Sequence, residues 1–190
     1  ELCNHKAFTS GFADFWVFLS RYPLAMLTNV LIILVTLAPG LFLRRRRFWY
    51  TLVSAVWLIG GGVNGFILLY RMTPFTTADL TVLNTGLDTL PNYMSKGYIA
   101  LLAAALVLLV AALAYLLLRG KRSGQPLKRR LLSGALATAL SAAALGACWS
   151  AAFKKGQLTD VFSNLGAAYD NYGFSYCFLQ TWLNKGIRLP

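Results

Sequence analysis

The chain has 190 residues, of which 57% are hydrophobic and only 13% are charged, and its net charge is +12. Soluble domains carry about 25% charged residues, so this composition excludes an ordinary soluble domain. A single histidine, His5, and six scattered acidic residues form no metal-binding constellation. The chain also has no phosphate-binding glycine loop and no nucleophile elbow, so we expect no catalytic, cofactor-binding or metal-binding residue within it.

The apolar residues gather in four blocks, at residues 24–43, 48–70, 98–118 and 131–153. Each block is long enough to cross a bilayer, which takes about 20 helical residues. Alternation typical of strands is weak, and the third block is rich in Ala and Leu, which favour helix. The sequence therefore predicts an all-α membrane protein with a transmembrane domain of four helices over residues 23–153.

Charge predicts the orientation of these helices. Ten of the eighteen basic residues lie in two links, residues 44–47 and 119–130, and neither link holds an acidic residue. Lys and Arg collect in short cytoplasmic loops, so we expect both links inside the cell and both chain ends outside. Because the arginine runs border spans, they face anionic lipid, and this interpretation is favoured over nucleic-acid binding.

Residues 1–22 form the first outer segment, and aromatic side chains cluster over residues 8–18. Aromatic residues prefer the membrane boundary, so we expect a short interfacial helix, with the fraying start of the first span as the alternative. The sequence begins at Glu1 without a signal peptide. An outside start therefore leads us to expect a further span upstream, in a longer protein.

Small and polar residues predict where the spans pack. Gly61 and Gly65 form a pair of small residues one turn apart in the second span, and such faces let helices approach closely. The fourth span carries small residues at every fourth position: Ala135, Ala139, Ala143 and Ala147. An amide in hydrocarbon needs a partner, so we expect Asn29 and Asn64 to contact each other. No acidic residue lies in any span, so neither amide is an expected ion site.

The link between the second and third spans contains an amphipathic segment at residues 76–90. Thr76 and Asp79 have the spacing of a helix start in which the hydroxyl caps early backbone N–H groups and the acid is favoured at the positive end of the helix dipole. Leucines then recur on one helical face, and Pro91 ends the pattern. Because the segment is too short to span, we expect a helix lying flat on the outer surface, with an ordinary re-entrant connector as the alternative.

Residues 154–190 are rich in Tyr, Phe, Asn and Gly, and charged residues interrupt them too often for a span. We expect an outer linker helix lying on the surface. Cys177 in this segment and Cys3 both fall outside, where a disulfide is compatible with an oxidising exterior. The odd cysteine count and the absence of a spacing motif favour free, buried thiols instead.

Two motifs in the outer segments match a known pattern. Residues 71–80, RMTPFTTADL, follow a span, and residues 169–178, YDNYGFSYCF, are followed by N-x-G-I-x-x-P at residues 184–190. The first resembles the R-x-TP-x-x-x-x-D-L stretch of lipoteichoic acid synthase-like proteins, in the membrane-bound sulfatase and alkaline-phosphatase superfamily. The second resembles the segment that joins that family's membrane and catalytic domains. Residues 22–33 and the arginine turn at 44–47 are similar to its early helices.

The resemblance implies a membrane domain of five helices, the first upstream of this chain, and an extracellular α/β catalytic domain after Pro190. That domain would hold a divalent metal, often manganese, and a Thr nucleophile. Members of the family transfer glycerol phosphate from phosphatidylglycerol onto a growing polymer, and some relatives are sulfatases or other phosphoglycerol transferases. None of the catalytic motif lies in these residues, so no catalytic role is carried over.

Five outer residues are candidate contacts for a lipid headgroup or for the catalytic domain: Arg71, Thr73, Asp79, Tyr172 and Tyr176. Arg71 is the best candidate for a phosphate contact, because its guanidinium lies at the outer boundary. A salt bridge to Asp79 or a snorkelling anchor explains the same arginine.

The expected function is a membrane anchor and lipid-facing platform for an extracellular phosphoglycerol transferase or sulfatase-family enzyme. It would lie in the bacterial cell membrane and act on phosphatidylglycerol in lipoteichoic acid-type polymer synthesis. The alternative is a non-enzymatic membrane module with several spans, such as a transporter or an assembly subunit. The spans lack charges and have no break other than Pro39, which argues against transport.

Overall fold

The computed structural model describes residues 16–70, 73–81, 85, 88, 91–92, 95–121, 123–162 and 164–183. All regular structure within these residues is helical. Four long helices are apolar enough to cross a membrane, and each differs from its predicted range by at most four residues at either end. They are α2 (Pro23–Leu37) continued by the 3₁₀-helix η2 (Ala38–Phe42), α3 (Arg46–Tyr70), α6 (Lys96–Arg119) and α7 (Leu127–Lys154). The predicted all-α membrane fold with four spans is confirmed.

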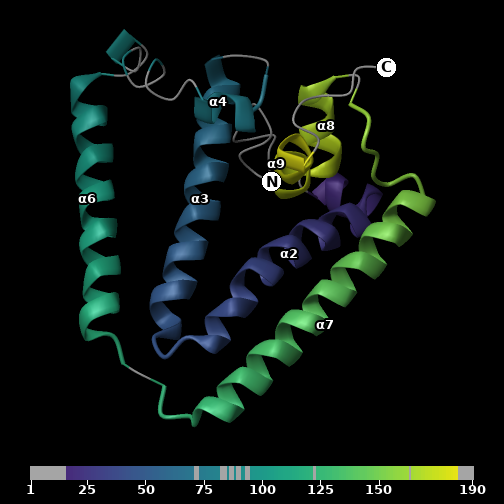
Figure 1. Ribbon diagram of the computed structural model, residues 1–190. Helices are drawn as coiled ribbons and strands as arrows, with labels where there is room; N and C mark the ends of the chain where they lie inside the picture. Colours follow the sequence, from purple (N-terminus) through teal and green to yellow (C-terminus); the bar gives the residue numbers. More distant parts are fainter. Residues whose placement is uncertain are drawn as a thin grey trace.

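Three short helices gather at one end of the spans (Figure 1): α4 (Thr77–Thr81), α8 (Leu165–Tyr172) and α9 (Phe174–Leu183). We call the described part of residues 73–81 and 158–183 the cap. The opposite end, where η2 leads to α3 and α6 leads to α7, carries the basic links, and we call it the basic end. Residues 16–21, the last part of the predicted interfacial segment, are also helical, while residues 1–15 lie outside the described residues.

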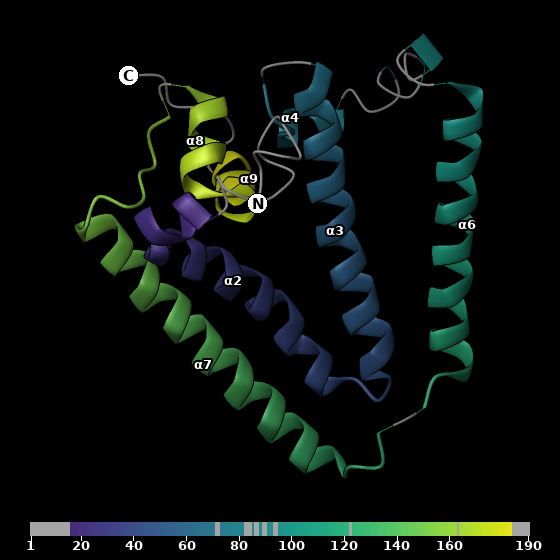
Figure 2. The ribbon, with the colours of Figure 1, turned by 180° about the vertical axis from the view of Figure 1, so that it is seen from behind.

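Helices α2 and α7 run side by side along their length in both views (Figures 1 and 2). The buried residues of α7 recur every seven positions at Gly134, Ser141 and Cys148, the spacing of a helix seam. Thr28 on α2 meets Cys148, with 3.4 Å between Oγ1 and Sγ. The predicted alanine stripe, residues 135, 139, 143 and 147, is exposed instead. The packing prediction for this helix was therefore wrong, because small residues occupy two faces and α2 covers the other one.

The basic end of this helix pair is joined by Arg130. Its side chain is buried in the first turn of α7, and Nη2 donates a hydrogen bond to the Phe42 carbonyl at 2.9 Å. A cation is unfavourable at the N-terminus of its own helix. Here it satisfies a carbonyl at the end of η2, where helix geometry leaves carbonyls without partners.

Helix α3 is joined to α2 through two indoles that reach the same threonine. Trp49 Nε1 donates to the Thr36 carbonyl at 3.1 Å, and Trp57 Nε1 donates to Thr36 Oγ1 at 3.0 Å. Helix α6 lies beside α3 and apart from the α2–α7 pair (Figures 1 and 2), and it buries no residue. The transmembrane region therefore consists of a packed group, α2, α3 and α7, with α6 at its edge.

A glycine substitution tests the contact between η2 and α7. A Cβ at Gly134 would lie 2.7 Å from the Phe42 ring, whereas a Cβ at Gly146 on the same helix meets nothing within 4 Å. We expect Gly134→Ala to lower the free energy of unfolding by about 1–3 kcal/mol through overpacking. Gly146→Ala is the matched control, and its higher helix propensity adds at most about 1 kcal/mol of stability. Denaturant unfolding in detergent measures both, and equal effects would contradict the close contact.

Candidate functional site

The largest fully buried side chains of the described chain are Tyr169 and Tyr176, and both belong to the cap. Trp149, near the end of α7, packs edge-on against Tyr176 with ring centroids 4.9 Å apart, and Phe75 stacks on Phe178 at 5.8 Å. Burying such a ring contributes about 1.5–3 kcal/mol. The cap is therefore a packed aromatic core seated on the ends of the spans, and the described part of the predicted outer linker helix forms two short helices within it, α8 and α9.

The two buried phenols hold the loops of the cap in place. Tyr169 donates to the Phe75 carbonyl at 2.8 Å, and Tyr176 donates to the Thr159 carbonyl at 2.8 Å. Tyr176 also accepts a hydrogen bond from Gln180 Nε2 at 3.0 Å. Desolvation by burial raises the pKa of both phenols above the ordinary tyrosine value. Both groups therefore stay protonated and keep donating across the neutral range.

The side chain of Asn29 connects α2 to the junction between α8 and α9. Its Nδ2 donates to the Tyr172 carbonyl at 2.7 Å and to the Ala25 carbonyl at 2.8 Å, and its Oδ1 accepts from the Tyr176 amide at 2.9 Å. At this junction Gly173 adopts φ +87°, a conformation that favours glycine. One amide thus satisfies a carbonyl at the end of α8 and an N–H at the start of α9, groups that helix ends leave without partners.

Asn64 makes the equivalent connection from α3. It is buried, and its Oδ1 accepts a hydrogen bond from the Phe75 amide at 2.8 Å. The contact predicted between Asn29 and Asn64 is not made by a hydrogen bond, because all three hydrogen bonds of Asn29 go to backbone groups, one in α2 and two in the cap. Both buried amides have partners, as predicted, and each binds at least one backbone group of the cap.

The predicted helix start at Thr76 and Asp79 is confirmed in its position, but the carboxylate and not the hydroxyl binds a backbone N–H group. The Asp79 carboxylate accepts from the Thr76 amide at 2.7 Å and from the Thr76 hydroxyl at 3.1 Å. Helix α4 follows as five residues, and most of the predicted helix beyond it lies outside the described residues. Pro91, where the sequence pattern was expected to end, is itself helical.

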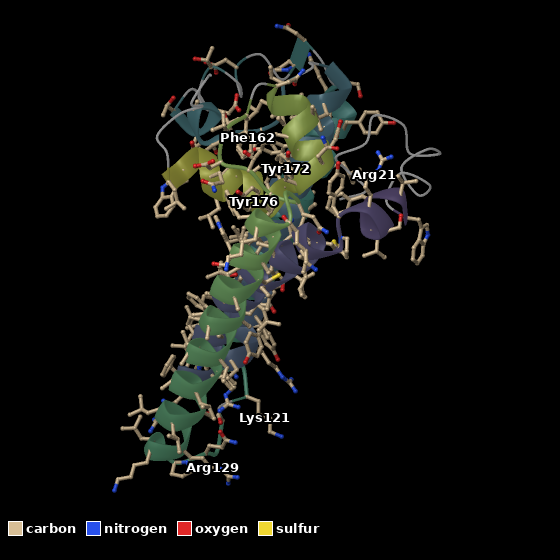
Figure 3. The ribbon with its side chains drawn as sticks, turned by 90° about the vertical axis from the view of Figure 1, so that its right-hand side faces the viewer. Arg21, Lys121, Arg129, Phe162, Tyr172 and Tyr176 are labelled. Carbon is tan, nitrogen blue, oxygen red and sulfur yellow. The ribbon has the colours of Figure 1, made fainter. Side chains whose placement is uncertain are left out.

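The remaining candidate contacts fall in different environments. Thr73 is exposed and Tyr172 is half-buried, with its ring 6.2 Å from that of Phe162. Tyr176 has no exposed surface, which removes it from any contact with a headgroup or another domain. Arg71 lies outside the described residues. Figure 3 shows Phe162, Tyr172 and Tyr176 close together in the cap.

Of the glycine pair predicted on α3, Gly61 makes no close contact with the described residues. A Cβ at Gly61 meets nothing within 4 Å, whereas a Cβ at Gly60 would lie 3.3 Å from the Phe174 ring of α9. Gly65 is half-buried. The close approach on this helix is therefore between Gly60 and the cap, and Gly61 takes no part in it.

Neither described cysteine forms a disulfide, as favoured from the sequence. Cys148 and Cys177 are both buried, and Cys177 Sγ donates to the Ala168 carbonyl at 3.3 Å. Cys3 lies outside the described residues. No group of three or more His, Cys, Asp or Glu residues that suits a metal ion occurs in the part of the chain that the structure describes. The polar groups of the cap mainly hold backbone, so its arrangement serves to fix segments in place.

No family model, no curated protein and no solved structure matches this chain. The function is therefore inferred from the geometry of the cap and of the basic end.

Replacing Asn29 tests the connection between span and cap. Asn29→Leu leaves the Tyr172 carbonyl and the Tyr176 N–H without their partner, so we expect the cap to lose about 1–3 kcal/mol of local stability. In a background with Cys3→Ser and Cys148→Ala, alkylation of buried Cys177 should become faster. Asn92→Leu makes the same chemical change at an exposed helical position and should not alter the rate. An unchanged rate in both variants would show that Asn29 does not hold the cap.

Because Tyr169 and Tyr176 are buried as neutral phenols, we predict that the cap becomes less stable at alkaline pH. Because the folded state holds the phenol protons more tightly than the unfolded chain, their contribution is complete below about pH 10 and falls as the pH rises further. Tyrosinate absorbance and Cys177 alkylation should therefore rise together above that pH. Tyr169→Phe should cost about 1 kcal/mol at neutral pH and make the alkaline loss less steep. Tyr115→Phe, on the exposed surface of α6, is the control, and an identical profile in both variants would contradict the assignment.

Proposed function

We propose that the chain is the membrane anchor and lipid-facing platform of an extracellular phosphoglycerol transferase or sulfatase-family enzyme. The enzyme would act on phosphatidylglycerol in lipoteichoic acid-type polymer synthesis, in the bacterial cell membrane. The observation that carries this proposal is the attachment of the cap. Asn29 and Asn64 each bind cap backbone from within a span, so the cap is held rigidly at the membrane boundary.

A rigid cap suits a platform because it limits where an attached domain can move. A domain connected to α9 would remain close to the plane of the lipid headgroups. Confinement of this kind raises the effective concentration of a catalytic site near a membrane substrate. A mobile linker in the same place would leave most orientations of the domain unproductive.

The distribution of charge supports an extracellular cap. The segments on the cap side of the spans contain all four acidic residues after Asp14, namely Asp79, Asp88, Asp160 and Asp170. The two links at the basic end contain ten basic residues and no acidic one. The positive-inside rule then favours the basic end in the cytoplasm. The metal of the reaction, manganese by the family resemblance, would belong to the catalytic domain, where it stabilises charge on the transferring phosphoryl group.

A non-enzymatic membrane module is the second candidate. Helix α6 buries no residue, which suits a helix that packs against another membrane protein. The four spans lack charged residues in their apolar centres, and ion or proton pathways are usually marked by such residues. An assembly subunit therefore fits the described chain better than a transporter.

Purified full-length protein in proteoliposomes tests the two candidates. We expect manganese-dependent release of diacylglycerol from phosphatidylglycerol, and none from phosphatidylcholine, which carries no glycerol phosphate headgroup. Combining Asn29→Leu with Asn64→Leu should lower this rate several-fold if the cap positions the enzyme, while Asn92→Leu should leave it unchanged. Folded protein that consumes neither phosphatidylglycerol nor a sulfate ester would reject the enzyme and favour the module.

A further inference from the structure

The two basic links are hydrogen-bonded to each other in spite of their charge. The Ser123 amide donates to the Arg44 carbonyl at 2.7 Å, and Arg46 Nη2 donates to Gln125 Oε1 at 2.5 Å. These bonds join the turn after η2 to the turn after α6. One backbone hydrogen bond and one bond from a guanidinium to a neutral amide thus hold together two segments whose cationic side chains repel one another.

A cavity of about 350 Å³ lies between these links. Four of its lining side chains are cationic, and the lining residues are Arg44, Arg46, Arg47, Lys121, Ser123 and Gly124. The sequence has no acidic residue between positions 15 and 78 or between 89 and 159, so no carboxylate of the spans or of these links can balance the charge. An anion in the cavity would relieve this repulsion.

Arg46 offers such an anion an unused donor. Its Nε is buried and has no hydrogen-bond partner, although the same guanidinium binds Gln125 through Nη2. A buried donor without an acceptor is costly. Gly124 adds open space, because a Cβ there would meet nothing within 4 Å. Phosphate oxygens are the acceptors that the planar guanidinium group fits best.

A second cavity, of about 510 Å³, shares Arg44 with the first. Its wall is partly apolar, with Leu43, Phe48 and Leu117 beside Arg44 and Arg45. Phe48 lies at the start of α3 and Leu117 near the end of α6, while residues 43–45 connect η2 to α3. The neighbouring cavities therefore offer a cationic compartment and an apolar one on either side of a shared arginine.

We propose that the two cavities form a binding site for an anionic phospholipid, with its phosphodiester in the cationic cavity and the first part of an acyl chain in the apolar one. The pairing of charge and apolar surface favours a lipid over a free phosphate, which would use only the first cavity. Basic pockets between membrane helices bind lipid headgroups by this chemistry. The site lies at the opposite end from the cap, as Lys121 and Arg129 show in Figure 3, and it does not rest on the proposed function.

Binding measurements on the purified protein in detergent test the site. The probes are phosphatidylglycerol and phosphatidylserine, which are both anionic, with phosphatidylcholine as the zwitterionic control, and native mass spectrometry reports occupancy. We expect both anionic lipids to bind. Combining Arg44→Gln with Lys121→Gln should weaken their binding at least about tenfold, from the loss of two cationic contacts.

The matched control combines Lys128→Gln with Arg129→Gln. These residues are exposed on the same end and line neither cavity, and their loss changes the net charge equally. An equal loss of binding in both double variants would overturn the site and leave only general attraction to the basic end. Inorganic phosphate and glycerol phosphate form a further arm, and binding of either as tightly as the lipids would overturn the role of the apolar cavity.

A second variant tests the site in case the combined Arg44→Gln and Lys121→Gln variant does not fold. Gly124→Glu adds a carboxylate to the wall of the cationic cavity without removing a hydrogen bond that joins the links. It should abolish selection of anionic lipids over phosphatidylcholine while thermal unfolding stays close to that of the parent protein. A folded Gly124→Glu protein that still selects anionic lipids would overturn the proposal.

Discussion

The hydrogen bonds of Asn29 determine how the two halves of this protein fit together. An amide in a membrane span is unfavourable unless it is satisfied, and here its partners are the backbone groups on either side of Gly173. The Asn29 amide needs hydrogen-bond partners, and so do the backbone groups at the end of α8 and the start of α9, so each satisfies the other. Helix α7 packs along another side of α2. Helix α2 therefore positions both α7 and the cap.

The two ends of the molecule are stabilised by different interactions. At the cap end, aromatic rings bury one another, and hydroxyl or amide groups bind backbone. At the basic end, Arg130 and the paired links hold the helices together by donating to carbonyls. The first kind of contact resembles the interior of a soluble domain, whereas the second depends on cations at a membrane boundary. Salt should therefore affect the basic end more than the cap.

Hydropathy predicted the spans well because length and apolar composition alone decide whether a helix crosses a membrane. Local signals also succeeded where the chemistry is local, as at Thr76 and Asp79, three residues apart. Contacts between spans were predicted less well. On α7, the stripe through Gly134, Ser141 and Cys148 is buried while the alanine stripe is exposed, and both have the small residues that close packing requires.

The cap was the least predictable part. Its aromatic residues are typical of a membrane boundary as well as of a packed core, and only tertiary contacts distinguish the two. Gln157, directly before the cap, illustrates the same limit, since its side chain accepts a hydrogen bond from the Leu24 amide in the first turn of α2 at 2.9 Å. Pro23 marks that helix start in the sequence, but nothing local indicates which distant residue satisfies it.

The separation of Asn29 from its partners has a consequence for biosynthesis. The partner groups at Tyr172 and Tyr176 follow it by 143 and 147 residues, so they emerge from the ribosome after all four described spans. Until then the first of these spans stands in the bilayer with an amide that lacks its final partners. The hydrogen bonds between Asn29 and the cap therefore form late in synthesis, and the packing of the spans is not fixed by the cap until its residues have been translated.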